Sequence, residues 1–503
     1  MKNIILETVK KWSDEKAATI FFDEGTLSPT YSDLENQSDS LAFYLENNYQ
    51  NKDNILVYGG QNSQMVTSFL ACTKSGHGYI PVDAHTPVDR VQMILEESQA
   101  TCVISLSEWP LNISDKVITL EKYETLTISG DKASLKHMVA GEDVYYTIFT
   151  SGTTGKPKGV QITYNNLESF CEWMLSDFSL KTGQRFLCQA PFSFDLSVMD
   201  LYPSLLTAGT LVPMEKNMVE SFPLLFSSIP KMDLNVWVST PSLVEICLLN
   251  PDFTGEKLPS LENFQFCGEE LPHGVAQKLL ERFPEAIIFN TYGPTEATVA
   301  ITSVQITQDI LDSNERLPLG RVKSDTRLII LNDEGQAQRK GEIGEIIIEG
   351  PGVSTGYFNN IEKTEEAFFS YEGKPAYKTG DAGLLKDGLL YYKGRLDFQI
   401  KWHGYRIELG DIDHHLMENS RIRHACVVPK YNKNHKVQQL IAYVVLECES
   451  DFEEKELTKV LKTELESSVM DYMIPQRFIY VDQLPLTSNG KVDRKALINE
   501  VNK

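Results

Sequence analysis

The chain has 503 residues, of which 42% are hydrophobic and 23% are charged. Its length exceeds that of one ordinary domain of about 100–200 residues, and its composition is far from that of a disordered chain. The formal net charge of −23 and the lack of a long run of Lys and Arg argue against nucleic acid or an anionic membrane as the main partner. We therefore expect a folded protein with more than one lobe.

No segment resembles a membrane span or a cleaved leader. The longest apolar runs fall short of the ~18 residues that a spanning helix needs, and the amphipathic start from Ile4 to Trp12 lacks the apolar core of a signal peptide. The eight cysteines are scattered, without a CxxC pair or a Cys/His ligand spacing. We therefore expect a cytoplasmic protein whose cysteines stay reduced.

Short apolar runs bounded by Gly, Pro, Asn or Asp recur along the chain and predict strands. They lie at 54–58, 101–104, 145–149, 286–289, 327–331 and 345–348. Helical patterns fall between many of them, at 63–74, 88–97, 167–175 and 274–282. This alternation predicts an α/β fold, with a large multi-lobed N-terminal domain built of layered sheets and helices.

The pattern changes after Arg395. A short strand at 396–402, a turn at His403–Gly404 and further short elements near 425–428 and 440–446 predict a small, mobile α+β domain. From residue 398 onward the chain has 15 Lys and Arg against 16 Asp and Glu, so this part is nearly neutral and the rest is strongly acidic. We place the two domains at residues 1–396 and 397–503.

The strongest local signal follows directly on the strand that ends at Phe149. Three glycines allow tight turns and a close approach of the backbone to an anion, while hydroxyl groups and two lysines can bind its oxygens. The order of a Walker A loop is absent, because Lys156 is followed by Pro157. The segment predicts a phosphate-binding loop of another kind, formed by Thr150, Ser151, Gly152, Thr153, Thr154, Gly155 and Lys158.

Four further motifs follow in chain order. They read Asn290-Thr291-Tyr292-Gly293-Pro294-Thr295-Glu296, Tyr377-Lys378-Thr379-Gly380-Asp381, Tyr392-Lys393-Gly394-Arg395-Leu396-Asp397 and Leu486-Thr487-Ser488-Asn489-Gly490-Lys491. With the loop they resemble the acyl-adenylate-forming superfamily, which includes acyl-CoA synthetases, luciferases and the adenylation domains of nonribosomal peptide synthetases. The resemblance covers nearly the whole chain.

The resemblance implies ATP and Mg²⁺ as cofactors and a role for each motif. The ring of Tyr292 would stack on adenine, Asp381 would accept hydrogen bonds from the ribose hydroxyls, and Glu296 would bind the metal ion. The implied nucleotide contacts further include Asn290, Thr291, Gly293, Pro294, Thr295, Tyr392, Lys393, Gly394, Arg395 and Lys491. The implied catalytic groups are Lys491, Thr295, Glu296 and Arg395. Lys491, Thr295 and the Mg²⁺ held by Glu296 would offset charge on the α-phosphate, and Arg395 would donate to ribose or phosphate oxygens.

Lys491 lies in a polar loop that contains a glycine, and alone it would be read as a solvated lysine. In the superfamily this lysine enters the cleft for adenylation and then leaves as the small domain rotates about a hinge. The resemblance therefore implies a hinge at Asp397 and a contact of Lys491 with both nucleotide and substrate.

Asp195, in the segment Pro191-Phe192-Ser193-Phe194-Asp195, indicates the class of acid. Members of the superfamily that activate amino acids resemble this pattern, and a carboxylate in a pocket requires a cation such as an α-ammonium group. We interpret Asp195 as the anchor of the amino group. The alternative is an aspartate that caps a helix near 196–201.

Cys267, in Phe266-Cys267-Gly268-Glu269-Glu270, stands where adenylation domains usually have glycine. Its side chain would shrink the pocket and add chiral bulk beside the substrate Cα. This favours a substrate no larger than alanine. Within the superfamily the chain is most similar to the members that activate D-alanine and load it onto a carrier protein, for D-alanylation of lipoteichoic acid. This similarity implies that Val299 lines the pocket beside Cys267.

The accepting thiol is expected on a separate phosphopantetheinylated carrier, because no Gly-Gly-x-Ser-like attachment site is found. The basic cluster Arg421, Arg423, Lys430, Lys433 and Lys436 is either a solvated face or a docking patch for this acidic partner. Three alternatives stay open: an adenylation enzyme for another small amino acid, an acyl-CoA synthetase, and a ligand-binding relative without catalysis.

Overall fold

The computed structural model describes residues 2–50, 52–152, 155–402, 404–432, 436–447, 453–487 and 491–502. The chain divides into two compact units. Unit 1 comprises Met1–Ala84, Ser98–Ile148 and Gly159–Leu396, and unit 2 comprises His85–Glu97, Phe149–Lys158 and Asp397–Lys503. Most of helix α4 (Val88–Ser98) and the loop that follows strand β5 therefore group with the C-terminal residues.

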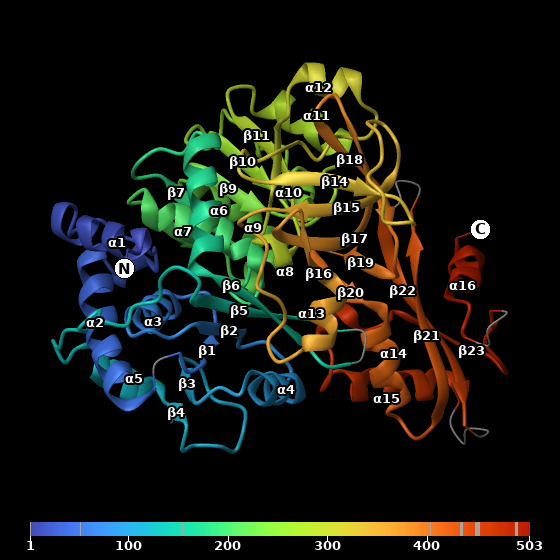
Figure 1. Ribbon diagram of the computed structural model, residues 1–503, viewed down its shortest axis with the longest axis horizontal. Helices are drawn as coiled ribbons and strands as arrows, with labels where there is room; N and C mark the ends of the chain where they lie inside the picture. The colour runs from blue at the N-terminus through green and yellow to red at the C-terminus, as the bar shows by residue number, and fades with distance from the viewer. Residues whose placement is uncertain are drawn as a thin grey trace. The chain divides into compact units, whose positions relative to one another are not determined.

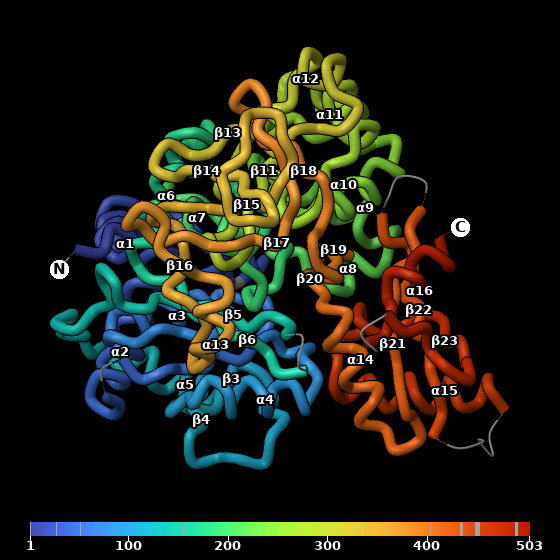
Figure 2. The backbone as a smooth tube through the Cα atoms, turned by 45° about the vertical axis from the view of Figure 1, so that its right-hand side comes forward, coloured from blue at the N-terminus to red at the C-terminus, as the bar shows by residue number. Residues whose placement is uncertain are grey.

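The first sheet has six strands in the order β4-β3-β1-β2-β5-β6. The pairings of β4 with β3, β3 with β1, β1 with β2 and β2 with β5 are all parallel. The strands are β1 (Ile55–Gly59), β2 (Tyr79–Asp83), β3 (Cys102–Ser105), β4 (Val117–Ile118), β5 (Val144–Thr150) and β6 (Lys158–Thr163). Figures 1 and 2 draw in blue to blue-green the helices α1 (Ile4–Glu15), α2 (Tyr31–Asn48), α3 (Ser63–Lys74) and α5 (Leu120–Thr127), which belong to the same part of the chain as this sheet.

The second sheet has seven strands in the order β13-β12-β11-β10-β9-β7-β8. Strands β8, β7, β9, β10 and β11 are parallel, and β12 and β13 continue the sheet antiparallel. Their bounds are β7 (Arg185–Cys188), β8 (Thr210–Pro213), β9 (Val236–Ser239), β10 (Asn263–Phe266), β11 (Ile287–Tyr292), β12 (Thr302–Gln305) and β13 (Arg321–Val322).

Alternate residues of the second sheet enter different hydrophobic cores. In β9, Val236 and Val238 pack with α6 (Tyr164–Asp177) and α7 (Val198–Leu206), whereas Trp237 packs into a second cluster. The helices on that second side are α9 (Phe222–Met232), α10 (Pro241–Cys247), α11 (His273–Arg282) and α12 (Gln308–Ser313). The short helix α8 (Lys216–Glu220) precedes α9 and contributes to the same cluster. Burial of both faces explains why these strands read as continuous apolar runs.

The third sheet is antiparallel, in the order β14-β15-β17-β16 with β18 also paired to β17. Both views show β14, β15 and β17 side by side. The elements are β14 (Arg327–Leu331), β15 (Gly344–Glu349), α13 (Ile361–Ala367), β16 (Phe368–Tyr371), β17 (Lys374–Lys386) and β18 (Leu389–Arg395). The predicted α/β fold with layered sheets is confirmed.

The C-terminal part of unit 2 has two small sheets. β19 (Gln399–Trp402) pairs with β20 (Tyr405–Glu408), and a second sheet has the order β21-β22-β23. Its elements are α14 (Leu409–Met417), β21 (Ile422–Tyr431), β22 (Val437–Leu446), α15 (Glu454–Leu465), β23 (Arg477–Tyr480) and α16 (Arg494–Val501). Among the described helices of the whole chain, none has the length and apolar composition needed to cross a membrane.

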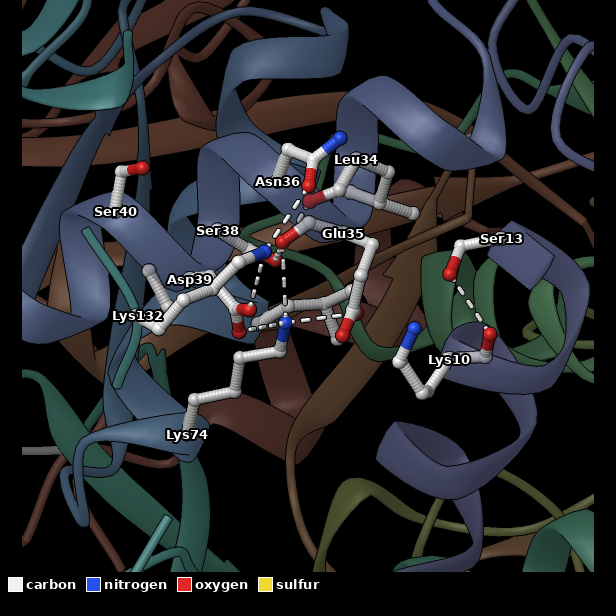
Figure 3. A network of polar contacts seen from close by, with 12 residues as sticks. Lys10, Ser13, Leu34, Glu35, Asn36, Ser38, Asp39, Ser40, Lys74 and Lys132 are labelled. Atoms are coloured by element: carbon white, nitrogen blue, oxygen red, sulfur yellow. Dashed lines mark hydrogen bonds and ion pairs between the residues drawn. The ribbon is translucent and has the colours of Figure 1, made fainter. Parts of the chain in front are cut away.

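A buried ion-pair network joins α2 to the end of α3. The Lys74 ammonium lies 2.8 Å from Glu35 and 2.7 Å from Asp39, and its side chain is only 2% exposed. Figure 3 shows Lys74 pointing between the two carboxylates, with Lys132 on the outer side of Asp39 at 3.1 Å. Because two carboxylates and one ammonium are withdrawn from water together, each charge depends on the others.

Replacing Lys74 with Met should lower the free energy of unfolding by about 3–5 kcal/mol, because Glu35 and Asp39 would lose their buried cation. The control is Lys10→Met, since the Lys10–Asp14 pair is 55% and 63% exposed and contributes at most about 0.5 kcal/mol. Urea titration of both variants is the measurement. Equal unfolding midpoints would contradict the role assigned to Lys74.

Candidate functional site

Several predicted site residues of unit 1 lie at the carboxyl edge of the second sheet. The parallel register pairs Phe266 of β10 with Asn290 of β11 and with Ser239 of β9, so the three strands end at the same edge. Open parallel sheets bind ligands outside such an edge. Cys267 follows β10 directly and Thr291 and Tyr292 end β11, so these residues lie close together in space.

The segment after β11 turns tightly, so that Gly293 lies against Val299 and Ala300 later in the same loop. A Cβ added at Gly293 would lie 2.5 Å from the Cα of Ala300, so only glycine fits this approach. Pro294 then leads into one 3₁₀ turn, η3 (Thr295–Ala297), in which Thr295 and Glu296 are both buried. The turn ends with Thr298 and Val299 in the left-handed region, at φ 57° and 67°.

The side chain of Cys267 meets the backbone of Val299. The Cys267 thiol donates to the Val299 carbonyl over 3.7 Å, and the two residues are 3% and 2% exposed. The adjacency that the sequence predicted is therefore present. A β-branched residue at positive φ costs on the order of 1–3 kcal/mol, so the fold holds Val299 in a strained position beside Cys267.

Tyr292, Asp381 and Arg395 form a hydrogen-bonded chain that links the second and third sheets. The Tyr292 hydroxyl donates to one Asp381 oxygen at 2.5 Å, and the Arg395 guanidinium donates to the other at 2.9 Å. Arg395 also donates to the carbonyl of Thr379 at 3.0 Å, and the register of β17 and β18 places Asp381 opposite Arg395. Burial and the Asp381 charge raise the pKa of the Tyr292 phenol well above its ordinary value, so it remains a donor.

Asn290 offers a free acceptor inside the fold. Its side-chain amide donates to the Pro318 carbonyl at 2.8 Å, and it is only 2% exposed. Its Oδ1 has no hydrogen-bond partner among the described residues. A buried carbonyl oxygen without a donor costs free energy, and an exocyclic amine such as that of adenine would satisfy it.

Glu296 is fully buried and accepts a hydrogen bond from the Tyr357 hydroxyl at 2.8 Å. The described residues contain no cluster of three or more His, Cys, Asp or Glu that could hold a metal ion unaided. Mg²⁺ commonly binds through one or two carboxylates together with substrate phosphates. A single carboxylate at this position fits that mode of binding.

The predicted phosphate loop lies in unit 2, except that Thr153 and Thr154 fall outside the described residues. The Ser151 hydroxyl donates to the Arg406 carbonyl at 3.2 Å and accepts from the Glu408 amide at 3.3 Å. Gly155 has φ 79° and a Cβ there would lie 2.1 Å from the His414 ring. The remaining loop positions are Thr150, whose hydroxyl donates to the Lys158 carbonyl at 3.5 Å, and the buried Gly152.

Of the two lysines in the predicted phosphate loop, one is already paired with an acidic side chain. The Lys156 ammonium lies 2.7 Å from Glu97, an exposed partner on α4, so this positive charge is already offset. The sequence could not show this pair, because 59 residues separate its members. Lys158 opens β6 and stays the predicted cation of the loop.

Lys491 is exposed and belongs to a turn in unit 2. Its amide donates to the Thr487 hydroxyl at 3.2 Å, and its carbonyl accepts from the Thr487 amide at 2.7 Å. Residues 488–490 of the motif lie outside the described residues. The backbone of the lysine is therefore held at the base of the turn, while its side chain reaches into solvent.

Asp195 is half-buried in a 3₁₀ turn, η2 (Asp195–Ser197), just before α7. The capping position of η2 is Phe194 and that of α7 is Ser197, and neither helix has a side-chain cap. Asp195 is therefore the first residue of η2 and not the N-cap residue of α7.

Three polar contacts near the predicted residues were missed from the sequence. Arg316 forms a two-point ion pair with Glu270, with both N to O distances at 2.6 Å, and its guanidinium lies 5.1 Å from the ring of Tyr392. Tyr357 donates to Glu296. Arg316 and Tyr357 lie in segments without a motif, so no local sequence pattern marks them.

Strand β18 has one irregularity in its pairing with β17. Gly394 lies opposite Ala382 and Tyr392 opposite Gly383, so the exposed Lys393 is the extra residue of a β-bulge.

In the basic cluster, Arg421 pairs with Glu464 at 3.1 Å and Arg423 with Glu447 at 3.3 Å, both on the surface. Lys433 lies outside the described residues.

Comparison with known proteins identifies the family. The AMP-binding enzyme family matches residues 6–358, and the AMP-binding enzyme C-terminal domain matches residues 411–491. The chain belongs to the AMP-binding enzyme family, and the superfamily predicted from the motifs is confirmed. Enzymes of this kind use ATP.

Curated relatives match over nearly the full length. The chain is 48% identical to the D-alanine--D-alanyl carrier protein ligase of Lacticaseibacillus casei (strain BL23), over 99% of both chains. It is 47% identical to the ligase of the same name from Bacillus anthracis, again over 99% of both chains.

Solved structures share the fold. The Vibrio cholerae adenylation domain AlmE, in complex with glycyl-adenosine-5'-phosphate, has a TM-score of 0.81 at 22% identity and covers 99% of this chain and 97% of its own. The o-succinylbenzoate CoA synthetase of Bacillus subtilis has a TM-score of 0.85 at 21% identity, with coverage of 99% and 98%.

Replacing Tyr292 with Phe should destabilise the protein by about 1–3 kcal/mol, because the buried Asp381 oxygen loses its donor. Tyr391→Phe is the matched control, since its hydroxyl donates to Asn314 at 3.1 Å in a half-buried place and should contribute about 1 kcal/mol or less. Urea unfolding measures both. A smaller loss for Tyr292→Phe than for the control would refute the importance of the chain to Asp381.

Proposed function

We propose that this protein activates D-alanine with ATP and transfers it to the thiol of a separate carrier protein. The proposal is supported by the contact of the Cys267 thiol with the Val299 backbone at the sheet edge, in a chain 48% identical to a D-alanine--D-alanyl carrier protein ligase. A thiol in place of the usual glycine hydrogen limits the acid to a small side chain. Use of the product for D-alanylation of lipoteichoic acid, in the cytoplasm where ATP is available, belongs to the same proposal.

In the first reaction a carboxylate oxygen of D-alanine attacks the α-phosphorus of ATP. The bond from that phosphorus to the bridging oxygen breaks, which yields D-alanyl-AMP and pyrophosphate. Asn290 and Tyr292 hold the adenine, Asp381 the ribose, and Arg395, Thr295 and Lys491 stabilise charge on the phosphate oxygens. Glu296 would hold Mg²⁺, which supplies further charge neutralisation when bound.

In the proposal, contacts with the α-ammonium group and with the groups on the Cα orient D-alanine. Asp195 pairs with the α-ammonium group, which gives this half-buried carboxylate a cationic partner. Cys267 and Val299 limit the volume beside the Cα, so that one arrangement of the methyl group and hydrogen is favoured. In this proposal residues 1–396 hold both substrates, and residues 397–503 carry Lys491 and rotate about Asp397.

In the second reaction the phosphopantetheine thiolate of the carrier attacks the acyl carbon of D-alanyl-AMP. The thioester forms as the bond to the AMP oxygen breaks, so AMP leaves. Arg421 and Arg423 are offset by surface acids, which leaves Lys430 as the better candidate of the basic cluster for contact with an acidic carrier.

ATP–pyrophosphate exchange across D-alanine, L-alanine, glycine, D-serine and a short fatty acid tests the proposal. D-alanine should give the highest kcat/KM, because the pocket admits no larger side chain and is chiral. Highest activity with the fatty acid would indicate an acyl-CoA synthetase, and no exchange with any acid would indicate a binding protein.

Lys491→Ala should lose exchange by about 100-fold or more, because a positive charge aimed at the developing phosphate charge is removed. Transfer from preformed D-alanyl-AMP to the carrier should remain near normal, since that step involves a different face of the small domain. Lys495→Ala, an exposed neighbour on α16, should leave both reactions unchanged. Normal exchange in Lys491→Ala would remove this lysine from the mechanism.

Cys267→Ala should reduce the ratio of kcat/KM for D-alanine over L-alanine by about 10-fold, the scale of one small group in a pocket. Cys72→Ala is the control for a buried cysteine elsewhere, because Cys72 lies fully buried on α3. The ratio is measured by exchange with each enantiomer. An unchanged ratio in the Cys267 variant would show that specificity arises elsewhere.

A further inference from the structure

Helix α16 begins three residues after Lys491, and its first residue forms a buried ion pair. The Arg494 guanidinium donates to a carboxylate oxygen of Asp413 on α14. The two side chains are only 14% and 10% exposed. The other oxygen of Asp413 accepts from the Val427 amide on β21 at 2.6 Å, so the carboxylate is itself fixed by the sheet.

Arg494 also contacts the segment that follows the predicted hinge. Its guanidinium lies 5.2 Å from the centroid of the Phe398 ring, one residue after Asp397. Arginine over an aromatic face is a favourable cation–π arrangement. One side chain therefore connects α16, α14 and the start of the C-terminal segment, all within unit 2.

The turn that carries Lys491 leads straight into this anchored helix. Leu486 and Val492 form an antiparallel bridge, and the Asp493 amide donates to the Pro485 carbonyl at 2.8 Å. Asp493 then caps α16 by accepting from the Ala496 amide at 3.0 Å. Because these contacts are local, the direction of the turn relative to the rest of unit 2 depends on what holds the first turn of α16.

A buried ion pair is a poor source of stability but a good source of defined geometry. Apolar residues of similar volume often replace such pairs without loss of stability, because the desolvation cost offsets the attraction. Burial lowers the pKa of Arg494 to about 10, which still leaves it charged at neutral pH. A charged group kept in such a place acts by fixing where its neighbours lie.

We propose that Asp413 and Arg494 are positioning residues for Lys491, holding the lysine turn in the orientation that adenylation requires. The inference rests on the proposed role of Lys491. Neither residue touches the reacting atoms in this proposal, so their effect is confined to the reaction that uses the lysine.

The test compares the two half-reactions in Arg494→Met and Asp413→Asn. Exchange kcat should fall about 10- to 100-fold, since a misplacement of about 1 Å can cost 100-fold in rate. Single-turnover transfer from preformed D-alanyl-AMP to the carrier should change by less than about 3-fold, because that reaction does not use Lys491. The KM values for ATP and D-alanine should change less than kcat, because in the proposal residues 1–396 make most of the contacts with both substrates. Lys495→Met, exposed on the same helix, is the matched control.

Two further variants, Lys491→Ala and the double variant Lys491→Ala/Arg494→Met, distinguish an error in the proposed role of Lys491 from an error in the positioning role of Asp413 and Arg494. In the double variant exchange should fall no further than in Lys491→Ala, because the pair acts through the lysine. Normal exchange in Lys491→Ala would refute the proposed function of the lysine itself. Loss in Lys491→Ala with normal exchange in Arg494→Met and Asp413→Asn, or a parallel loss of both half-reactions in those variants, would overturn the positioning role.

Discussion

The parallel pairing of β10 with β11 determines where the predicted residues of unit 1 meet. Because Phe266 lies opposite Asn290, Cys267 leaves the sheet beside the end of β11. Side chains alternate between faces along a strand, so a slip of one residue would turn every side chain of β11 to the opposite face. The contacts of Asn290 with Pro318 and of Tyr292 with Asp381 both depend on this register.

The third sheet is tied to this edge by a short polar chain. Tyr292 comes from β11, whereas Asp381 and Arg395 come from β17 and β18. A buried carboxylate held by two donors from different sheets transmits position between them, because losing either donor leaves a charge without compensation. Arg395 is also the last residue of β18, so this chain reaches the end of unit 1.

Much of the fold was predictable from local pattern, and the strands at 327–331 and helix at 63–74 have the predicted bounds. The predicted family and its ligase chemistry are also confirmed by the comparisons. Contacts such as Lys74 with Glu35 and Arg316 with Glu270 were not predictable, because a polar pair between distant segments has no periodicity. Burial of a lysine contradicts its usual surface preference, and only tertiary packing reveals it.

The strained backbone at Val299 has a consequence for the evolution of this protein. Glycine or asparagine would adopt the same left-handed conformation at lower cost, so a screen for heat resistance would favour them at this position. The same substitutions would remove the branched side chain of Val299, whose backbone carbonyl contacts Cys267. Under the proposed function, selection for heat resistance and selection for discrimination between D- and L-alanine therefore act in opposite directions on Val299.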